Sequence, residues 1–358
     1  SLVGSEMCIR DSCMSLLEIK GLETEFQTEQ GVVKALRGIN YTVDRGEVLG
    51  IVGESGSGKS VGMLSLMGLL APNGTVTAGE MIFDGEDISP IKYKTKKEKK
   101  EYEKKMNQIR GNDISMIFQD PMSYLNPIVT IEKQMTEGIR FHTKCSKKEA
   151  VQRAIELMKM VGIPAPESRL KQYPFEFSGG MRQRIIIAIA LACNPKLIVA
   201  DEPTTALDVT VQAQILDLLK DITKESNAGV IIITHDLGVV ASLCDRISIM
   251  YGGNIMEEGT TDEIFYDPKH PYTKGLLNSI ANSNVDHREP LKPIPGTPPD
   301  LLKLGDQCPF ASRCSEAMEI CTKASPLVTE FGETHKCKCW LHCKERWHEV
   351  WKGEDAYE

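Results

Sequence analysis

Uninterrupted apolar runs are the clearest feature of the hydrophobic and polar pattern along the chain. Leu197–Ala200 and Gly229–Ile233 contain no charged residue, and Val48–Val52 is a third run of the same kind. The first two are typical of parallel strands that are covered on both faces. Residues 211–225 lie between these two runs, and we expect them to form a helix. The pattern therefore predicts an α/β core built on a parallel sheet.

Weaker patterns surround these runs. Residues 16–52 favour several strands, and residues 79–85 end in an Asp-Gly turn that suits a short antiparallel hairpin. Residues 147–162 have apolar positions at helical spacing and stop at a glycine, and residues 185–192 are apolar all round, as in a buried helix. We therefore expect a mostly helical stretch, about 107–195, inserted into the core.

The two ends of the chain differ from this core. Residues 1–13 lack the cationic start and apolar centre of a signal peptide, and we expect a non-native leader before a natural start at Met14. After about residue 260 prolines gather, and six of the eleven cysteines fall between residues 308 and 343. The sequence thus predicts a domain over 14–260 and a separate C-terminal extension over 261–358.

Composition narrows the classes of function. A hydrophobic content of 41% and a charged content of 26% are ordinary for a soluble globular protein of 358 residues. The longest apolar stretch, Ile185–Cys193, is about half of what a membrane-spanning helix needs. A net charge of −8 argues against nucleic acid as the main ligand. The basic residues 92–105 alternate with acidic ones, which favours a solvated helix or a mobile loop.

Residues 53–60 carry the first candidate chemistry. They read Gly-Glu-Ser-Gly-Ser-Gly-Lys-Ser and follow the apolar run Val48–Val52. Glycines allow the backbone N–H groups to face one anion, Lys59 adds a positive charge, and the Ser60 hydroxyl is placed to bind Mg²⁺. The helix that follows points its positive end at the same place. This segment predicts that the chain binds a nucleoside triphosphate.

Further polar groups follow the predicted strands. Asp201 and Glu202 close the run Leu197–Ala200, where one carboxylate can hold Mg²⁺ and the other can deprotonate a water molecule. Ser178-Gly179-Gly180 opens a helix and offers a second phosphate site. His235 follows the run Gly229–Ile233, and Gln119 follows the apolar residues Ile114–Phe118.

This ordered set resembles the ABC ATPase family. Its motifs are Gly53–Ser60, Gln119, Ser178–Gln183, Leu197–Glu202, Ala206–Asp208 and His235, which together span most of residues 16–260. The resemblance implies a P-loop α/β core with an inserted helical subdomain and an antiparallel β subdomain. It also implies two modules that hold two ATP molecules head to tail, each site using the phosphate loop of one module and Ser178 and Gly180 of the other.

The family's site residues carry over to this chain by position. Glu202 is the implied general base, with His235 and Gln119 as the other catalytic residues. Ser60, Gln119 and Asp201 are the implied Mg²⁺ ligands. The implied nucleotide-binding residues are Gly53, Glu54, Ser55, Gly56, Ser57, Gly58, Lys59, Ser60, Val61, Asp201, Ser178, Gly179 and Gly180.

The C-terminal residues resemble one branch of this family. Residues 263–273, 294–299 and 308–314, with the stretch around Gln119, look like the ATP-binding subunits of oligopeptide/dipeptide importers. The resemblance implies two transmembrane permease subunits, a second ATPase subunit and an extracytoplasmic peptide-binding protein, with the chain peripheral at the cytoplasmic face of the membrane. The same machinery could import nickel or another small solute. Two rival hypotheses are a soluble ABC ATPase that acts on DNA or ribosomes and a nucleotide-sensing regulatory subunit.

Cys308, Cys314, Cys321 and Cys339 match the C-terminal pattern of this branch. In a reducing compartment clustered thiols more often bind metal than form disulfides. Four thiolates suit a [4Fe–4S] cluster or Zn²⁺, and their softness alone does not choose between the two. We expect an iron–sulfur cluster with a structural role, with zinc and unligated thiols as the alternatives.

Overall fold

A mixed sheet forms the centre of the protein. The computed structural model describes residues 15–118, 124–204, 209–279 and 294–349. Among these, eight strands pair in the order β11-β12-β10-β9-β3-β8-β7-β6, with β3, β6, β7, β8 and β9 parallel to one another. Their bounds are β3 (Val48–Val52), β6 (Ile114–Ile117), β7 (Leu197–Asp201), β8 (Gly229–Thr234), β9 (Arg246–Tyr251), β10 (Asn254–Thr260), β11 (Val328–Glu330) and β12 (Lys336–Lys338).

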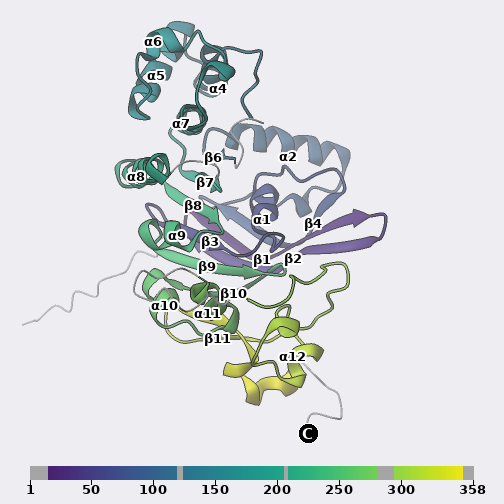
Figure 1. Cartoon of the computed structure of the whole chain (residues 1–358). Helices are drawn as coiled ribbons and strands as arrows, with labels where there is room; N and C mark the ends of the chain where they lie inside the picture. The colour runs from purple at the N-terminus through teal and green to yellow at the C-terminus, as the bar shows by residue number, and fades with distance from the viewer. Residues whose placement is uncertain (1–14, 119–123, 205–208, 280–293, 350–358) are drawn as a thin grey trace, which may run out of the picture.

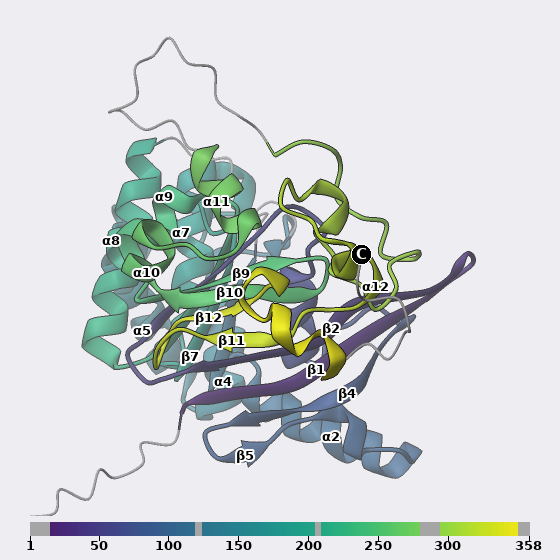
Figure 2. The same ribbon diagram turned by 90° about the horizontal axis from the view of Figure 1, so that it is seen from below.

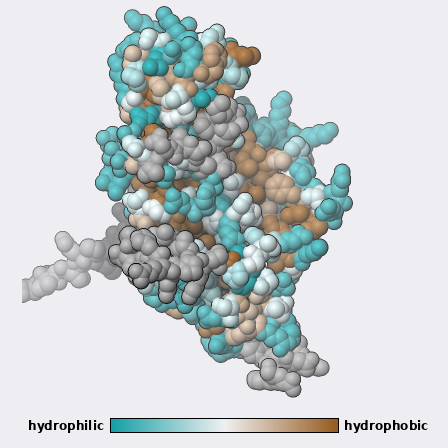
Figure 3. Space-filling view, viewed as in Figure 1, coloured by the Kyte–Doolittle hydropathy of each residue, from teal (hydrophilic) through white to brown (hydrophobic). Residues whose placement is uncertain are grey.

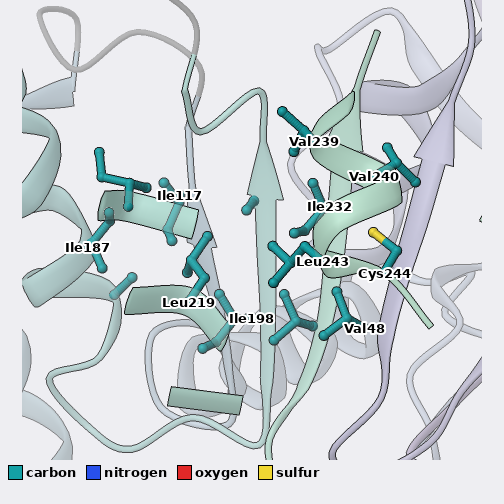
Figure 4. Close-up of a cluster of buried hydrophobic side chains, with 14 of the residues drawn as sticks. Val48, Ile117, Ile187, Ile198, Leu219, Ile232, Val239, Val240, Leu243 and Cys244 are labelled. Carbon is teal, nitrogen blue, oxygen red and sulfur yellow. The ribbon is translucent and has the colours of Figure 1, made fainter. Parts of the chain in front are cut away.

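Both faces of the parallel strands are buried, which explains the uninterrupted apolar runs. On one face Ile198 and Ile232 pack against helices α7 (Gly179–Ala190), α8 (Val209–Ser226) and α9 (Leu237–Leu243) (Figure 4). On the other face Leu49, Val199 and Ile231 pack with α1 (Lys59–Leu66) and the N-terminal strands. The predicted parallel strands are confirmed. Their runs are apolar throughout because alternate side chains point to opposite faces of the sheet, and both faces are covered.

An antiparallel sheet covers the second face. Its strands pair in the order β2-β1-β4-β5, with bounds β1 (Leu17–Thr28), β2 (Gly31–Val43), β4 (Gly74–Phe83) and β5 (Glu86–Asp87). β4 and β5 are joined by Asp84 and Gly85, which both have positive φ, as a tight hairpin turn requires. The charged residues 92–105 fall mostly in α2 (Lys96–Ile109), which begins with a Thr95–Glu98 capping box.

A group of helices lies at one end of the molecule (Figure 1). These are α4 (Ile131–Thr143), α5 (Lys147–Met160), α6 (Pro166–Arg169) and α7. Residues 114–117 fall within the stretch 107–195 that was expected to be the helical insertion, but they form β6 and pair with β7 in the main sheet. The helices themselves lie between β6 and β7 along the chain.

The C-terminal extension packs on the opposite end. It contains α10 (Thr261–Tyr266), α11 (Pro271–Asn278) and α12 (Glu319–Lys323), and its strand β12 pairs with β10 at Glu257 and Glu258. Arg37 of β2 donates hydrogen bonds to the carbonyl oxygens of Leu304 and Gly305. Figure 2 shows the extension, in yellow, lying across β10 and beside β2. The extension is therefore joined to both sheets.

The surface is mixed in character. Figure 3 shows apolar residues gathered below α2, while most of the helical end is hydrophilic. In the part of the chain that the structure describes, no helix combines the length and apolar character needed to cross a membrane.

Candidate nucleotide-binding site

The phosphate loop connects β3 to α1 at the carboxyl edge of the main sheet. Its glycines are required by geometry, since a Cβ on Gly53 would lie 2.1 Å from the carbonyl oxygen of Met250. Gly56 and Gly58 have φ of 78° and 103°, and Gly58 caps the N-terminus of α1. The loop therefore joins a glycine-rich turn to the N-terminus of α1, an arrangement that can bind an anion.

Lys59 is held inside this loop. Its Nζ donates hydrogen bonds to the carbonyl oxygens of Gly53 at 2.7 Å and Glu54 at 2.9 Å, and the residue is 8% exposed. Burial lowers the pKa of Lys59, whereas the nearby carboxylates of Glu202, Asp201 and Glu54 favour its charged form. The loop thus contains a fixed cation where phosphate oxygens would bind.

Ser60 and Asp201 meet across two elements. Asp201 ends β7, is buried, and accepts a hydrogen bond from the side chain of Ser60 in the first turn of α1. Burial is the main cause that raises the pKa of Asp201, and this hydrogen bond and Lys59 oppose it. A hydroxyl and a carboxylate in contact are oxygen ligands of the kind that Mg²⁺ uses, so the two residues fit this ion. Val61, the last predicted nucleotide-binding residue of this segment, follows Ser60 in the first turn of α1.

Glu202 lies immediately after Asp201 in an unusual backbone conformation. Its φ is 46°, in the left-handed region that residues other than glycine rarely adopt, and its N–H donates to the carbonyl of Ile233. Its Oε1 lies 3.0 Å from Nδ1 of His235, the residue that follows β8. Such strain gathers at functional sites. The carboxyl ends of β7 and β8 therefore bring together the predicted base, Glu202, and the predicted catalytic histidine, His235.

The second predicted phosphate site lies elsewhere. Ser178 caps α7 by accepting a hydrogen bond from the N–H of Met181, and Gly179 and Gly180 form the first turn. Figure 1 shows α7 well apart from α1. Within one chain, the structure therefore separates Ser178–Gly180 from the phosphate loop.

Two predicted positions cannot be placed. Gln119 and Ala206–Asp208 lie outside the described residues.

Contacts to the site from distant residues were not predicted from the sequence. Gln183, which is buried on α7, donates to the carbonyl of Pro203, directly after Glu202. The N–H of Glu54 donates to the hydroxyl of Tyr272, and Arg313 forms an ion pair with the Glu54 carboxylate. The motifs that contain Gln183, Tyr272 and Arg313 do not show these contacts, because each residue lies 20 or more positions along the chain from its partner.

The C-terminal cysteines do not form a metal centre in this structure. Among the described residues there is no group of three or more His, Cys, Asp and Glu side chains that could hold a metal ion. The N–H of Cys308 donates to the carbonyl of Cys321. Burial raises the pKa of both Cys308 and Cys339 to about 12, and the nearby thiols Cys314 and Cys321 add to this rise at both residues. The flanking His335 pairs with Glu257. The four thiols therefore lie near one another, but in the described part of the chain they do not form a metal-holding group.

Comparison with known proteins decides the family. The ABC transporter family matches residues 36–205, and a family described as "Oligopeptide/dipeptide transporter, C-terminal region" matches residues 256–321. The oligopeptide transport ATP-binding protein OppD of Bacillus subtilis (strain 168) is 52% identical over 327 residues, covering 91% of this chain and 88% of that protein. The chain belongs to the ATP-binding proteins of the oligopeptide/dipeptide ABC transporter family.

Other members of this family and solved ATP-binding cassettes agree. The dipeptide transport ATP-binding protein DppD of the same organism is 48% identical over 340 residues, which are 95% of this chain and 98% of that protein. A dimeric, post-hydrolysis structure of the ATP-binding cassette MJ0796, bound to ADP and Pi, shares 29% identity. It superposes with a TM-score of 0.59 and covers 68% of this chain and 98% of that one. The family and the fold predicted from the motifs are confirmed.

Proposed function

We propose that this chain hydrolyses ATP to drive the import of peptides across the cytoplasmic membrane, bound peripherally at its cytoplasmic face. One observation carries the proposal. Lys59, Ser60, Asp201 and Glu202 meet at the carboxyl edge of the main sheet in a chain whose C-terminal region matches the oligopeptide/dipeptide family. A nucleotide-sensing subunit has no need of a strained carboxylate paired with a histidine.

The residues divide the chemistry of hydrolysis between them. Lys59 and the loop N–H groups would bind the β- and γ-phosphate oxygens. Ser60 and Asp201 would hold Mg²⁺, which would supply positive charge that neutralises the phosphates. Glu202 accepts a proton from the water whose oxygen attacks the γ-phosphorus, while the bond to the ADP oxygen breaks. His235 contacts the carboxylate of Glu202, and in this proposal it also contacts the γ-phosphate.

A second ATPase module completes each site. Ser178, Gly179 and Gly180 lie apart from their own phosphate loop, and the serine hydroxyl and helix N-terminus suit the γ-phosphate held by a partner. The partner is a sister chain or a second copy of this chain. ATP is then held between two modules, and its hydrolysis lets them separate.

A groove beside the helical end suits a permease subunit. Its volume is about 680 Å³, and its lining includes Arg110, Phe118, Tyr124, Asn126, Lys133 and Glu137. The Tyr124 ring stacks on that of Phe118, with centroids 3.8 Å apart, yet it is 53% exposed. Leu125 also lines the groove, but its side chain is buried in the core. An apolar floor with charged walls fits a short cytoplasmic helix of a membrane partner.

Peptide uptake in cells tests the function. Cells that lack their own copy of this gene and carry the wild-type chain are expected to accumulate a labelled oligopeptide, and cells carrying an empty vector are not. Accumulation of nickel in place of peptide would contradict peptide import and favour the metal alternative.

In the same cells, Tyr124→Ala tests the groove. Removing the exposed ring deletes an aromatic contact of the kind that contributes about 2 kcal/mol or more at the centre of interfaces. We expect uptake, and the amount of chain recovered with the permease, to fall about 30-fold. Tyr266→Ala removes an equally large ring that is 85% exposed on α10, and should change neither. Equal uptake and equal recovery with the permease in the two variants would contradict the proposal that the permease binds this groove.

The iron–sulfur prediction remains as a separate proposal. It is supported by the residue types Cys308, Cys314, Cys321 and Cys339, and by their closeness, since Cys314 and Cys321 act electrostatically on both Cys308 and Cys339. If it is right, anaerobically purified protein contains iron and acid-labile sulfide and absorbs visible light, and Cys339→Ser lowers all three. Zinc in place of iron would favour the alternative metal. A colourless preparation without either metal would rule out a metal centre.

A further inference from the structure

One arginine of the C-terminal extension reaches the phosphate loop. Arg313 ends a short 3-10 turn, Ala311–Arg313, directly before Cys314. Its Nη1 donates to Oε2 of Glu54 at 2.6 Å, and its Nη2 donates to Oε1 of Glu54 at 3.1 Å. This two-point pair joins residues that are 259 positions apart in the sequence. It is a direct link between the extension and the nucleotide site.

The guanidinium of Arg313 is held in place on its other sides. Its Nε donates to the carbonyl of Pro295 at 2.8 Å, and Nη1 also donates to the hydroxyl of Tyr251 at 3.0 Å. The group lies 5.7 Å from the ring centroid of Tyr251 and 6.0 Å from that of Phe310. Its side chain is only 5% exposed. A guanidinium fixed at this many points has little freedom left to lose when it binds a carboxylate.

Glu54 is fixed at three separate atoms. Its N–H donates to the hydroxyl of Tyr272 at 3.0 Å, its carbonyl accepts from Nζ of Lys59 at 2.9 Å, and its carboxylate accepts from Arg313. Tyr272 and Arg313 both belong to the extension. The second residue of the phosphate loop is thus held between its own lysine and the C-terminal extension.

The charge of Glu54 makes this contact important for an anionic ligand. Its carboxylate lies close enough to Lys59 to favour the charged lysine, in the loop that would hold the phosphates. A carboxylate without a partner would repel phosphate and would be free to turn toward Lys59. Arg313 supplies the opposite charge and holds both carboxylate oxygens by hydrogen bonds.

We propose that Arg313 is a positioning residue for nucleotide binding, through which the C-terminal extension fixes the phosphate loop and neutralises its carboxylate. The proposal rests on the proposed function, in which residues 53–60 bind ATP. It gives the extension a role in the affinity for ATP that is independent of any metal at the cysteines. Arg313 acts through Glu54 and does not itself contact the nucleotide.

Enzyme kinetics and ATP binding with purified full-length chain test the proposal. We expect Arg313→Ala to raise the KM and the Kd for Mg-ATP about tenfold, with a much smaller change in kcat, since charge-assisted hydrogen bonds contribute roughly 1.5–3 kcal/mol. Glu54→Gln removes the repelling charge, so the double variant Glu54→Gln/Arg313→Ala should recover affinity to within about threefold of the wild type.

Matched variants separate positioning from folding. Arg346 forms a comparable two-point pair with Glu349 in the extension, so Arg346→Ala breaks such a pair elsewhere and should leave the KM unchanged. Arg313→Lys keeps the positive charge but loses the planar pair of donors that binds both carboxylate oxygens. Its KM is expected to lie between those of the wild type and Arg313→Ala. Thermal melting shows whether Arg313→Ala folds. If it does not, the ATP affinity of Arg313→Lys is compared with that of Arg313→Lys/Glu54→Gln, which again tests whether removing the Glu54 charge restores binding.

Three results would overturn the proposal. One is an unchanged KM in both Arg313 variants, and another is a loss of affinity that Glu54→Gln does not restore. The third is an equal loss of affinity in Arg346→Ala, which would indicate a general effect of the extension on folding. A wild-type chain that binds no ATP would instead contradict the proposed function, so the two failures are distinguishable.

Discussion

Glu202→Gln is expected to lower the kcat for ATP hydrolysis by about 100-fold to 1,000-fold while ATP binding is retained. A positioned general base contributes roughly 10²-fold to 10⁴-fold to the rate of a proton transfer. Glutamine has the shape of glutamate and can still hydrogen bond to His235, but it cannot accept the proton of the attacking water. The phosphate loop, Ser60 and Asp201 are untouched, so the binding of Mg-ATP should change little. Phosphate release and the binding of a fluorescent ATP analogue measure the two effects separately.

The control for this substitution is another carboxylate far from the site. Glu225 is exposed at the end of α8, and Glu225→Gln makes the same chemical change there. Its turnover should equal that of the wild type. Turnover at the wild-type rate in Glu202→Gln would show that the base lies elsewhere. Loss of both binding and turnover would show that Glu202 binds the metal ion or the nucleotide instead of acting as the base.

Lys59→Ala is expected to weaken ATP binding by at least about 100-fold and to abolish measurable turnover at ordinary ATP concentrations. Two effects add. The variant loses a buried cation from the phosphate site, and truncating one partner of a buried charge interaction costs roughly 2–5 kcal/mol. It also removes the hydrogen bonds that Lys59 donates to the carbonyl oxygens of Gly53 and Glu54, of which the second still accepts from the N–H of Ser57.

Stability should change much less than binding in this variant. Burial already disfavours the charged amine of Lys59, so its removal relieves a desolvation cost as it removes two hydrogen bonds. Lys303→Ala, at a lysine that is 82% exposed, serves as the control and should behave as the wild type. Thermal melting and titration with the fluorescent analogue check both variants. Tight ATP binding in Lys59→Ala would remove the basis for assigning Gly53–Ser60 as the phosphate site.

Parts of this site were predictable because neighbouring residues or one simple rule position them. The loop Gly53–Ser60 carries its glycines, lysine and serine within one turn, so the chemistry is visible in the local sequence. Asp201, Glu202 and His235 follow apolar runs, and the carboxyl ends of neighbouring parallel strands meet at one edge of a sheet. The 3.0 Å contact between Glu202 and His235 agrees with that rule.

Other features depended on packing. Leu125 is buried in the core although its neighbour Tyr124 is exposed, because a loop of this kind has no periodic pattern to show which side chain turns inward. The sequence located four cysteines in one extension, but spacing along an irregular chain does not set the distances between their side chains. In the described residues they do not form a metal-binding group.

The sequence by itself determined the phosphate loop, the covered parallel strands and the family, because each of these depends on residues adjacent in the chain or on the order of motifs along it. Only the tertiary structure decided how the loop is supported. Arg313, Tyr272 and Gln183 reach the site from distant segments, and such contacts depend on how strands, helices and the extension pack in three dimensions. A hydrogen bond between residues 54 and 313 leaves no trace in either local sequence.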